Sequence, residues 1–337
     1  MNREERIKAA IQGEAVDRVP INVWMHFSRY DQDPVSLAKA QVSFQEKYDF
    51  DFIKMMPFGL YTTQDWGAQI EIYCDPLKEP ELIDSSIRSA ADYEKIEPLP
   101  AVQGTWGKQL EFAQHISRLV QPHTPFVQTI FSPLTTLKKL AGERLTADME
   151  EHPQAVHQAL RAITETTIRF VKANIETGVS GFFFATQCAQ KDYLTDAQFR
   201  DFAKAYDLEV MNAYKDITYF NVVHIHGSDI RFTEIANEYP ANVINWHDRN
   251  TYPSLKEARK LCDKCFLGGI LEAPHLEGYH LVYKSILNKA NETQIQEHIR
   301  EAVEQAGERH LILGPGCVAD PRSPEAHIRA ARIAVDF

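Results

Sequence analysis

Two histidines and one cysteine in the second half of the chain are residue types that bind zinc. His224 and His226 stand two positions apart in an apolar, extended stretch, so both side chains point to the same face. Cys317 follows another apolar run, on a Gly-Pro-Gly turn that exposes it. Two histidines and a cysteine that leave a fourth position open are typical of a catalytic zinc site. The competing interpretation is that the histidines are hydrogen-bonded core residues and that the cysteine fills apolar space.

Four further polar residues follow other apolar runs and are candidates for catalysis or substrate binding. His247 and Glu272 are candidates for a fourth metal ligand, or for groups that hydrogen-bond to a ligand from behind. His26 and Arg29 follow the first apolar run, and an arginine can bind a carboxylate or a phosphate with two parallel hydrogen bonds. The competing interpretation of Arg29 is a surface ion pair with a neighbouring aspartate.

Short apolar runs rich in β-branched and aromatic residues must position these side chains. Eight runs alternate with helical patterns, which indicates a parallel sheet buried on both faces. Eight such units favour closure into a (β/α)8 barrel, the TIM barrel, whose active site lies at the carboxyl ends of the strands. The eight runs are Val19–Trp24, Phe52–Met56, Phe126–Ile130, Phe182–Ala185, Val222–Ile225, Val243–Trp246, Phe266–Ile270 and Leu311–Leu313.

The spacing of these runs also predicts how the chain is organised. A proline-rich segment, Pro76–Pro100, separates the second run from the third and predicts a long insertion after the second strand, of the kind that covers active sites. No linker or low-complexity segment divides the chain, so we expect residues 1–337 to form a single domain. No GxGxxG motif follows the first run, which argues against a dinucleotide-binding fold.

Composition and charge indicate which kind of molecule the protein binds and where in the cell it acts. A net charge of −11 over 337 residues is unsuited to general nucleic-acid binding, so a small-molecule substrate is expected instead. No apolar run is long enough to span a membrane, and the first residues lack the pattern of a signal peptide, so we expect a cytoplasmic protein. Five irregularly spaced cysteines do not predict a disulfide framework. A homodimer is the commonest assembly for such an enzyme.

Several stretches along the chain are similar to one known family. They are Arg6–Pro20, Trp24 with Ser28–Tyr30, Phe131–Leu137, Gly314–Cys317 and Ser323–Ala330. Together they resemble the uroporphyrinogen decarboxylase superfamily, over essentially the whole chain. The resemblance implies a (β/α)8 barrel, in agreement with the alternating pattern of the runs. It also implies one of two activities, since the superfamily holds porphyrinogen decarboxylases and corrinoid-linked methyltransferases.

The motifs resemble the methyltransferase branch more closely. Of the twin-arginine loop of the decarboxylases only Arg29 and Tyr30 are present. The methyltransferase pattern is His-x-Cys-Gly followed by a distant Gly-Cys-Gly, and here these read His224-Ile-His226-Gly and Gly-Cys317-Val. The resemblance implies zinc at these residues and a corrinoid that arrives on a partner protein or as a free ligand. His226 replaces a cysteine, which removes one negative charge from the ligand set.

Three hypotheses follow from the sequence. In the first, a zinc-dependent methyltransferase-like enzyme holds zinc at its His-x-His and cysteine motifs, His26 and Arg29 orient the substrate, and His247 or Glu272 handles a proton. In the second, a metal-free decarboxylase acts on a porphyrinogen or a smaller carboxylate, which Arg29 binds. In the third, the chain is a non-catalytic partner of a corrinoid protein or a ligand sensor; polar residues at so many strand ends argue against it.

Overall fold

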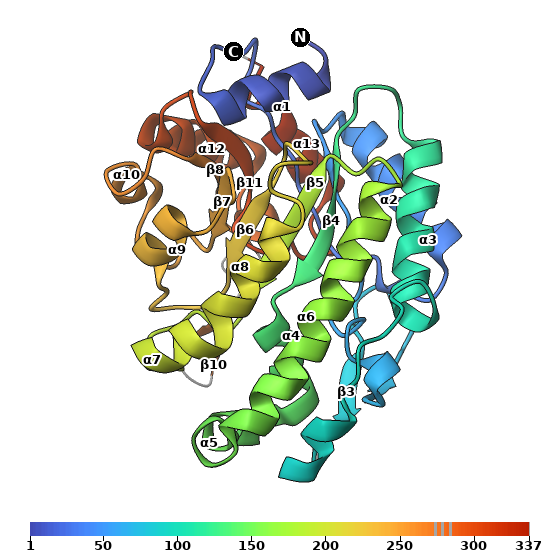
Figure 1. The fold of residues 1–337 in the computed structure, drawn as a ribbon. Coiled ribbons are helices and arrows are strands. Elements are labelled where there is room, and N and C mark those ends of the chain that lie inside the picture. Colours follow the sequence, from blue (N-terminus) through green and yellow to red (C-terminus); the bar gives the residue numbers. More distant parts are fainter. Residues whose placement is uncertain (273–274, 278–279, 283–284, 337) are drawn as a thin grey trace.

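Seven parallel strands form the centre of the computed structural model, which describes residues 1–272, 275–277, 280–282 and 285–336. The strands follow one another in the order β1-β4-β5-β6-β7-β8-β11, and the sheet is curled (Figure 1). Seven of the eight predicted runs coincide with them. The strands are β1 (Ile53–Lys54), β4 (Phe126–Phe131), β5 (Gly181–Thr186), β6 (Val222–Ile225), β7 (Val243–Trp246), β8 (Cys265–Ile270) and β11 (Leu311–Pro315).

The first predicted run, residues 19–24, is extended but forms a single β-bridge, between Ile21 and Leu313 of β11. The backbone N–H of Asn22 donates to the Leu313 carbonyl over 3.0 Å, and the N–H of Asp51 donates to the Ile21 carbonyl over 3.0 Å. The segment therefore lies between β11 and the residues that lead into β1. Pro20 has no backbone N–H to donate, which shortens the ladder that this run can form.

Helices cover the outside of the sheet, and both chain ends lie at the same end of the molecule, beside α1 (Figure 1). No helix in the described ranges is long and apolar enough to cross a membrane. The helices are α1 (Arg3–Gln12), α2 (Pro34–Tyr48), α3 (Gly104–Leu119), α4 (Pro133–Ala141), α5 (Leu145–Glu151), α6 (Pro153–Ile175), α7 (Asp196–Gln198), α8 (Ala205–Asn212), α9 (Phe232–Glu238), α10 (Leu255–Ala258), α11 (Ile286–Lys289), α12 (Glu292–Ala306) and α13 (Glu325–Ile333).

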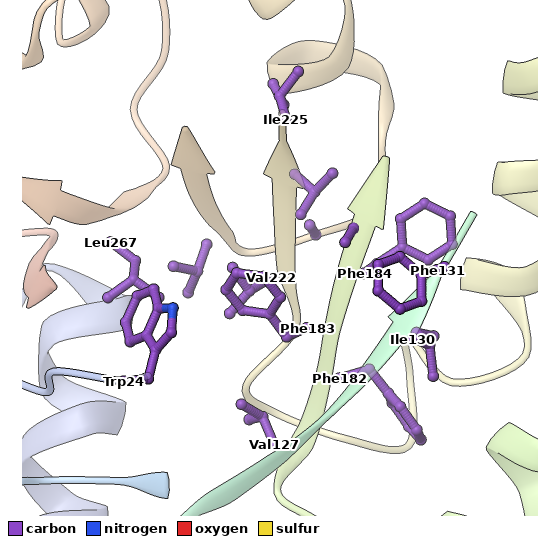
Figure 2. Close-up of a cluster of buried hydrophobic side chains, with 14 of the residues drawn as sticks. Trp24, Val127, Ile130, Phe131, Phe182, Phe183, Phe184, Val222, Ile225 and Leu267 are labelled. Carbon is purple, nitrogen blue, oxygen red and sulfur yellow. The ribbon is translucent and has the colours of Figure 1, made fainter. Parts of the chain in front are cut away.

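Side chains of the strands alternate between the helices outside and the interior of the curled sheet. On β5, Phe182 and Phe184 lie on one side of the strand and Phe183 lies on the other (Figure 2). All three are almost completely buried, as expected for a strand covered on both faces. Phe183 meets the edge of the Trp24 ring, with 5.9 Å between the ring centroids. The interior of the curled sheet is therefore aromatic around Phe183 and Trp24.

Residues 55–125, between β1 and β4, contain elements that the barrel pattern does not require. They include α3, two 3-10 helices (Gln64–Trp66 and Ala90–Lys95) and an antiparallel pair formed by β2 (Gln69–Glu71) and β3 (Glu81–Asp84). Within the predicted excursion, the hydroxyl of Tyr93 donates to Asp148 over 2.7 Å and so ties the segment to α5. A second antiparallel pair, β9 (His275–Glu277) and β10 (His280–Val282), follows β8.

Candidate metal centre and cavity

Three parallel strands bring four metal-binding side chains together at their carboxyl ends. His224 lies on β6 and His226 directly after it, His247 follows β7, and Cys317 follows β11 by two residues. One ligand atom from each residue lies within 4.8 Å of those of the other three. Because parallel strands end at the same edge of a sheet, side chains from distant parts of the sequence converge there.

Asn245 of β7 fixes the orientation of the His224 ring. Its side-chain nitrogen donates to two backbone carbonyls, those of Leu267 over 2.6 Å and Pro315 over 3.1 Å. Its oxygen must therefore be the acceptor for His224 Nδ1, which lies 2.6 Å away. His224 then carries its proton on Nδ1 and keeps the lone pair of Nε2 free, which is the usual arrangement of a metal-binding histidine.

Glu272 fixes the orientation of the His247 ring. Its carboxylate accepts a hydrogen bond from His247 Nδ1, so that His247 Nε2 keeps its lone pair. This Nε2 atom lies 3.2 Å from His226 Nδ1, and Cys317 Sγ lies 3.8 Å from the same Nδ1 atom. Three donor atoms from three strand ends thus meet around one point. The second carboxylate oxygen of Glu272 is buried and has no hydrogen-bond partner among the described residues.

The burial of this group controls the charges of its members. Burial, followed by the neighbouring histidines, lowers the pKa of His224 far below its ordinary value, and burial lowers the pKa of His226 to about 3. Both imidazoles are therefore neutral near neutral pH, the form that binds a metal. Burial, followed by the nearby Glu272 carboxylate, raises the pKa of the Cys317 thiol to about 12. A cation is needed to turn this thiol into a thiolate.

These residues fit a zinc ion on the chemistry of their donor set. Zinc prefers imidazole nitrogen and thiolate sulfur in a four-coordinate arrangement, and structural zinc sites are closed whereas catalytic ones keep a position open. Two of the three histidines already use Nδ1 in a hydrogen bond to a side-chain oxygen, as metal-binding histidines usually do. His247 can be the fourth ligand or can stand behind the site with Glu272, and the chain offers both arrangements.

The group lies in the wall of a cavity of about 360 Å³ at the carboxyl ends of the strands. Phe183 and Trp24 of the aromatic interior (Figure 2) also line it. Pro57, Gly59 and Glu79 come from the segment between β1 and β4 and line another part of the cavity. Of these three residues only Glu79 belongs to Pro76–Pro100, the segment expected to form an insertion.

His26 and Arg29, the two residues expected to orient a substrate, lie in different environments. His26 lines the cavity, and its Nε2 atom lies 3.5 Å from the Glu79 carboxylate. Burial lowers the pKa of His26. Arg29 lies in a 3-10 turn, Ser28–Tyr30, where it is exposed and does not line the cavity. Its substrate-binding role remains a prediction that the geometry of the cavity does not support.

Lys54 and Asn245 escaped the sequence analysis because both lie inside apolar runs. Lys54 of β1 lines the cavity and is only 5% exposed. Asn245, which orients His224, stands within Val243–Trp246. The polar residue itself could have indicated a functional role. A strand that is buried on both faces has no solvated side for a lysine or an asparagine, so either residue in such a strand needs a specific partner.

A parallel α/β sheet with a cavity and convergent polar groups at its carboxyl edge defines a protein of the barrel-like α/β class. The chain belongs to the uroporphyrinogen decarboxylase family, whose model matches residues 2–336. A methylcobamide:CoM methyltransferase of Methanosarcina mazei is 19% identical over 260 residues, which are 73% of this chain and 76% of that protein. A uroporphyrinogen decarboxylase of Flavobacterium johnsoniae is 21% identical over 65% of this chain and 69% of its own length.

Solved structures give the same fold. A methyltransferase from Methanosarcina mazei superposes with a TM-score of 0.81 at 19% identity and covers 100% of this chain and 98% of its own. A B12-independent methionine synthase from Shewanella sp. W3-18-1 reaches a TM-score of 0.57 at 11% identity, over 94% of this chain and 90% of that one. At these identities the likeness establishes the fold alone, and the activity has to be argued from the site.

Proposed function

We propose that this chain is a zinc-dependent, methyltransferase-like enzyme that activates a thiol or a similar nucleophile at the carboxyl edge of its sheet. One observation carries the proposal: the donor atoms of His224, His226 and Cys317 converge beside a cavity, with His247 next to them. If these side chains served only to pack the ends of the three strands together, apolar side chains would do so better, because buried polar groups are costly to desolvate. The methyltransferases among the relatives support this choice of activity.

In this proposal, His224 Nε2, His226 Nδ1 and the Cys317 thiolate hold the zinc. When bound, zinc lowers the pKa of a thiol in the open position and so keeps it as a nucleophilic thiolate. Asn245 holds the His224 ring in the metal-binding tautomer. Glu272 places a negative charge near Cys317, whereas the methyltransferase pattern has its second negative charge on a cysteine at the position of His226. This carboxylate offsets part of the charge that His226 removes from the ligand set.

The cavity sets the size and the source of the reactants. A volume of about 360 Å³ suits a small molecule. A corrinoid that serves as methyl donor would then approach the mouth from outside, on a partner protein or as a free ligand. We also infer that residues 19–24 take the place of the eighth strand, because they supply Trp24 to the wall of the cavity and bond to both neighbouring segments.

Metal content tests the proposal directly. We expect about one zinc per chain in protein purified without chelator, the stoichiometry of a three-ligand catalytic site. Cys317→Ala should lose the metal, whereas Cys188→Ala, which removes a buried cysteine outside the cluster, should keep it. Plasma mass spectrometry of the three proteins measures this. Zinc-free wild-type protein, or equal zinc in the two variants, would overturn the proposal.

The decarboxylase of the second hypothesis would need a different cavity. Among the described residues that line it, Lys54 is the only lysine or arginine, and the carboxylates of Glu79 and Glu272 line the same cavity. Binding the many carboxylates of a porphyrinogen asks for a strongly basic cleft. The charge of the cavity therefore favours the methyltransferase-like reaction, and release of carbon dioxide from a porphyrinogen would reverse this choice.

A further inference from the structure

The hairpin that β2 and β3 form, residues 69–84, has few attachments to the rest of the molecule. Two apolar side chains at its base, Ile70 and Leu82, pack partly against the core. Among the described residues, its hydrogen bonds and ion pairs stay within the hairpin or reach only to Arg88 just beyond it, with one exception. A segment with so few contacts opens at a low cost in free energy.

The exception is Glu79, which lies after the turn of the hairpin. Its carboxylate lies 3.5 Å from Nε2 of His26, and both side chains line the cavity. The side chain of Glu79 is 60% exposed whereas that of His26 is 12% exposed, so the contact lies where the cavity opens to solvent. Glu79 is therefore placed to hold the hairpin against the mouth of the cavity.

Asp31 is a buried carboxylate that interacts with Glu79. It is 3% exposed, and neither of its oxygens has a hydrogen-bond partner among the described residues. Burial, followed by the charge of Glu79, raises the pKa of Asp31 to about 7. Two like charges disfavour each other, so Asp31 is neutral in mildly acidic surroundings and repels Glu79 once it is ionised.

The basic groups around Glu79 respond to pH in the same direction. Burial lowers the pKa of His26, and the Glu79 carboxylate raises it; Lys54 and Lys139 lower it further. Burial lowers the pKa of Lys139 to about 7, and the Glu79 carboxylate opposes this effect. A group that Glu79 helps to keep protonated attracts Glu79 more strongly when it is protonated. Acidification therefore removes a negative charge from one neighbour of Glu79 and adds positive charge to others.

We propose that Glu79, His26 and Asp31 form a pH-sensitive latch at the mouth of the cavity. In acidic surroundings Glu79 pairs with His26 and holds the hairpin against the mouth. In alkaline surroundings the ionised Asp31 repels Glu79, and the turn of the hairpin moves away from the barrel. The latch goes beyond the function proposed above, because it controls access to the cavity whichever reaction takes place there.

The mobility of the hairpin tests the latch, and the chain carries a suitable position for a probe. Cys74 lies in the hairpin and is exposed, whereas Cys188, Cys262 and Cys265 are buried and Cys317 is partly buried. A nitroxide attached to Cys74 through a methanethiosulfonate reports mobility by electron paramagnetic resonance, and Cys74→Ser shows whether the label is confined to this position. The label should be less mobile at about pH 6 than at about pH 8.5. One pKa unit corresponds to a tenfold change in equilibrium, so we expect the ratio of immobile to mobile label to fall roughly tenfold.

Three labelled variants assign the response to its groups. Glu79→Gln should be mobile at both pH values, and Asp31→Asn, which cannot ionise, should show a smaller change than the wild type. Glu71→Gln is the matched control, because Glu71 is an exposed carboxylate of the same hairpin that does not line the cavity, and it should respond like the wild type.

A wild-type label whose mobility does not change with pH overturns the inference, and so does a wild-type response in Glu79→Gln or Asp31→Asn. Thermal unfolding shows whether each variant is folded. Because the side chain of Glu79 is largely exposed, Glu79→Gln should fold normally and decide the question even if Asp31→Asn is unstable.

Discussion

Asn245→Ala removes the group that orients His224 and leaves every proposed metal ligand in place. The wild-type side chain accepts from His224 Nδ1 and donates to the carbonyls of Leu267 and Pro315, which belong to two other strands. Without Asn245, His224 can rotate or take the other tautomer, in which Nε2 carries the proton and cannot bind metal. The substitution therefore acts on the metal through orientation alone.

The expected loss of zinc affinity is about 10- to 100-fold, the usual effect of removing a partner behind a ligand. This corresponds to about 1.4–2.7 kcal/mol of binding free energy. The metal-free protein also loses stability, because a buried group left without a hydrogen bond costs about 1–3 kcal/mol. Both changes should appear in Asn245→Ala, and only the second of them in a suitable control.

Asn242→Ala is that control. Asn242 precedes the same strand, β7, donates to the carbonyl of Tyr219 over 2.7 Å and accepts from the N–H of Asn221 over 2.9 Å, at the opposite end from the metal cluster. Competition with a chelator of known affinity measures zinc binding, and thermal unfolding in excess chelator measures the stability of the metal-free chain. Unchanged zinc affinity in Asn245→Ala, or an equal loss in Asn242→Ala, would refute the role assigned to Asn245.

Three further outcomes are expected. Glu272→Gln should lower zinc affinity about tenfold, measured by the same chelator competition, because a neutral amide holds the histidine ring behind the site less firmly than a carboxylate; equal affinity would contradict this. Gly316→Ala should reduce both zinc content and melting temperature, since the added methyl carbon would lie 2.7 Å from the carbonyl oxygen of Trp246 and 2.8 Å from the Glu272 carboxylate; wild-type values for both would show that the turn relaxes. Burial raises the pKa of Asp207 to about 8, so the unfolded chain releases this proton first, and Asp207 should lower the free energy of unfolding with a slope of about 1.4 kcal/mol per pH unit between about pH 4 and 8, in addition to the slopes of Asp31 and Asp248, whose pKa values burial raises to about 7. Asp207→Asn keeps the oxygen that accepts from Tyr239 and should lack this slope in denaturant titrations at several pH values; parallel pH profiles would argue against it.

The sequence predicted the residues of the candidate site where a rule of local geometry applied. The two-residue spacing of His224 and His226 predicted a common face, and the barrel pattern predicted that Cys317 and His247 would end at the same edge; the structure brings all four together. Their role as metal ligands is still a prediction. Asn245 could not be assigned in the same way, because its function depends on neighbours in other strands whose register the sequence does not specify.

In the fold, too, the features set by a local sequence pattern were predicted, and those that depend on contacts between distant residues were not. Continuous apolar runs predicted seven of the strands, since burial on both faces leaves a plain signal. Aspartate is a residue type that often precedes a helix, yet α9 begins only at Phe232 and not directly after Asp229, because Asp229 has a φ of 46°, which is outside the helical region. The contribution of Glu79 to the cavity was not predictable, because the path of a long insertion over a sheet depends on contacts that no short motif encodes.

The hydrogen bonds between residues 19–24 and β11 join the beginning of the chain to its end, which has a consequence for synthesis. During translation Ile21 emerges long before its partner Leu313, which lies 292 positions later in the chain (313 − 21). Closing so long a loop is slow, and an unpaired strand edge that waits for its partner is prone to aggregation. Truncation near either terminus therefore opens the same part of the sheet, beside Trp24, although the two ends are far apart in the sequence.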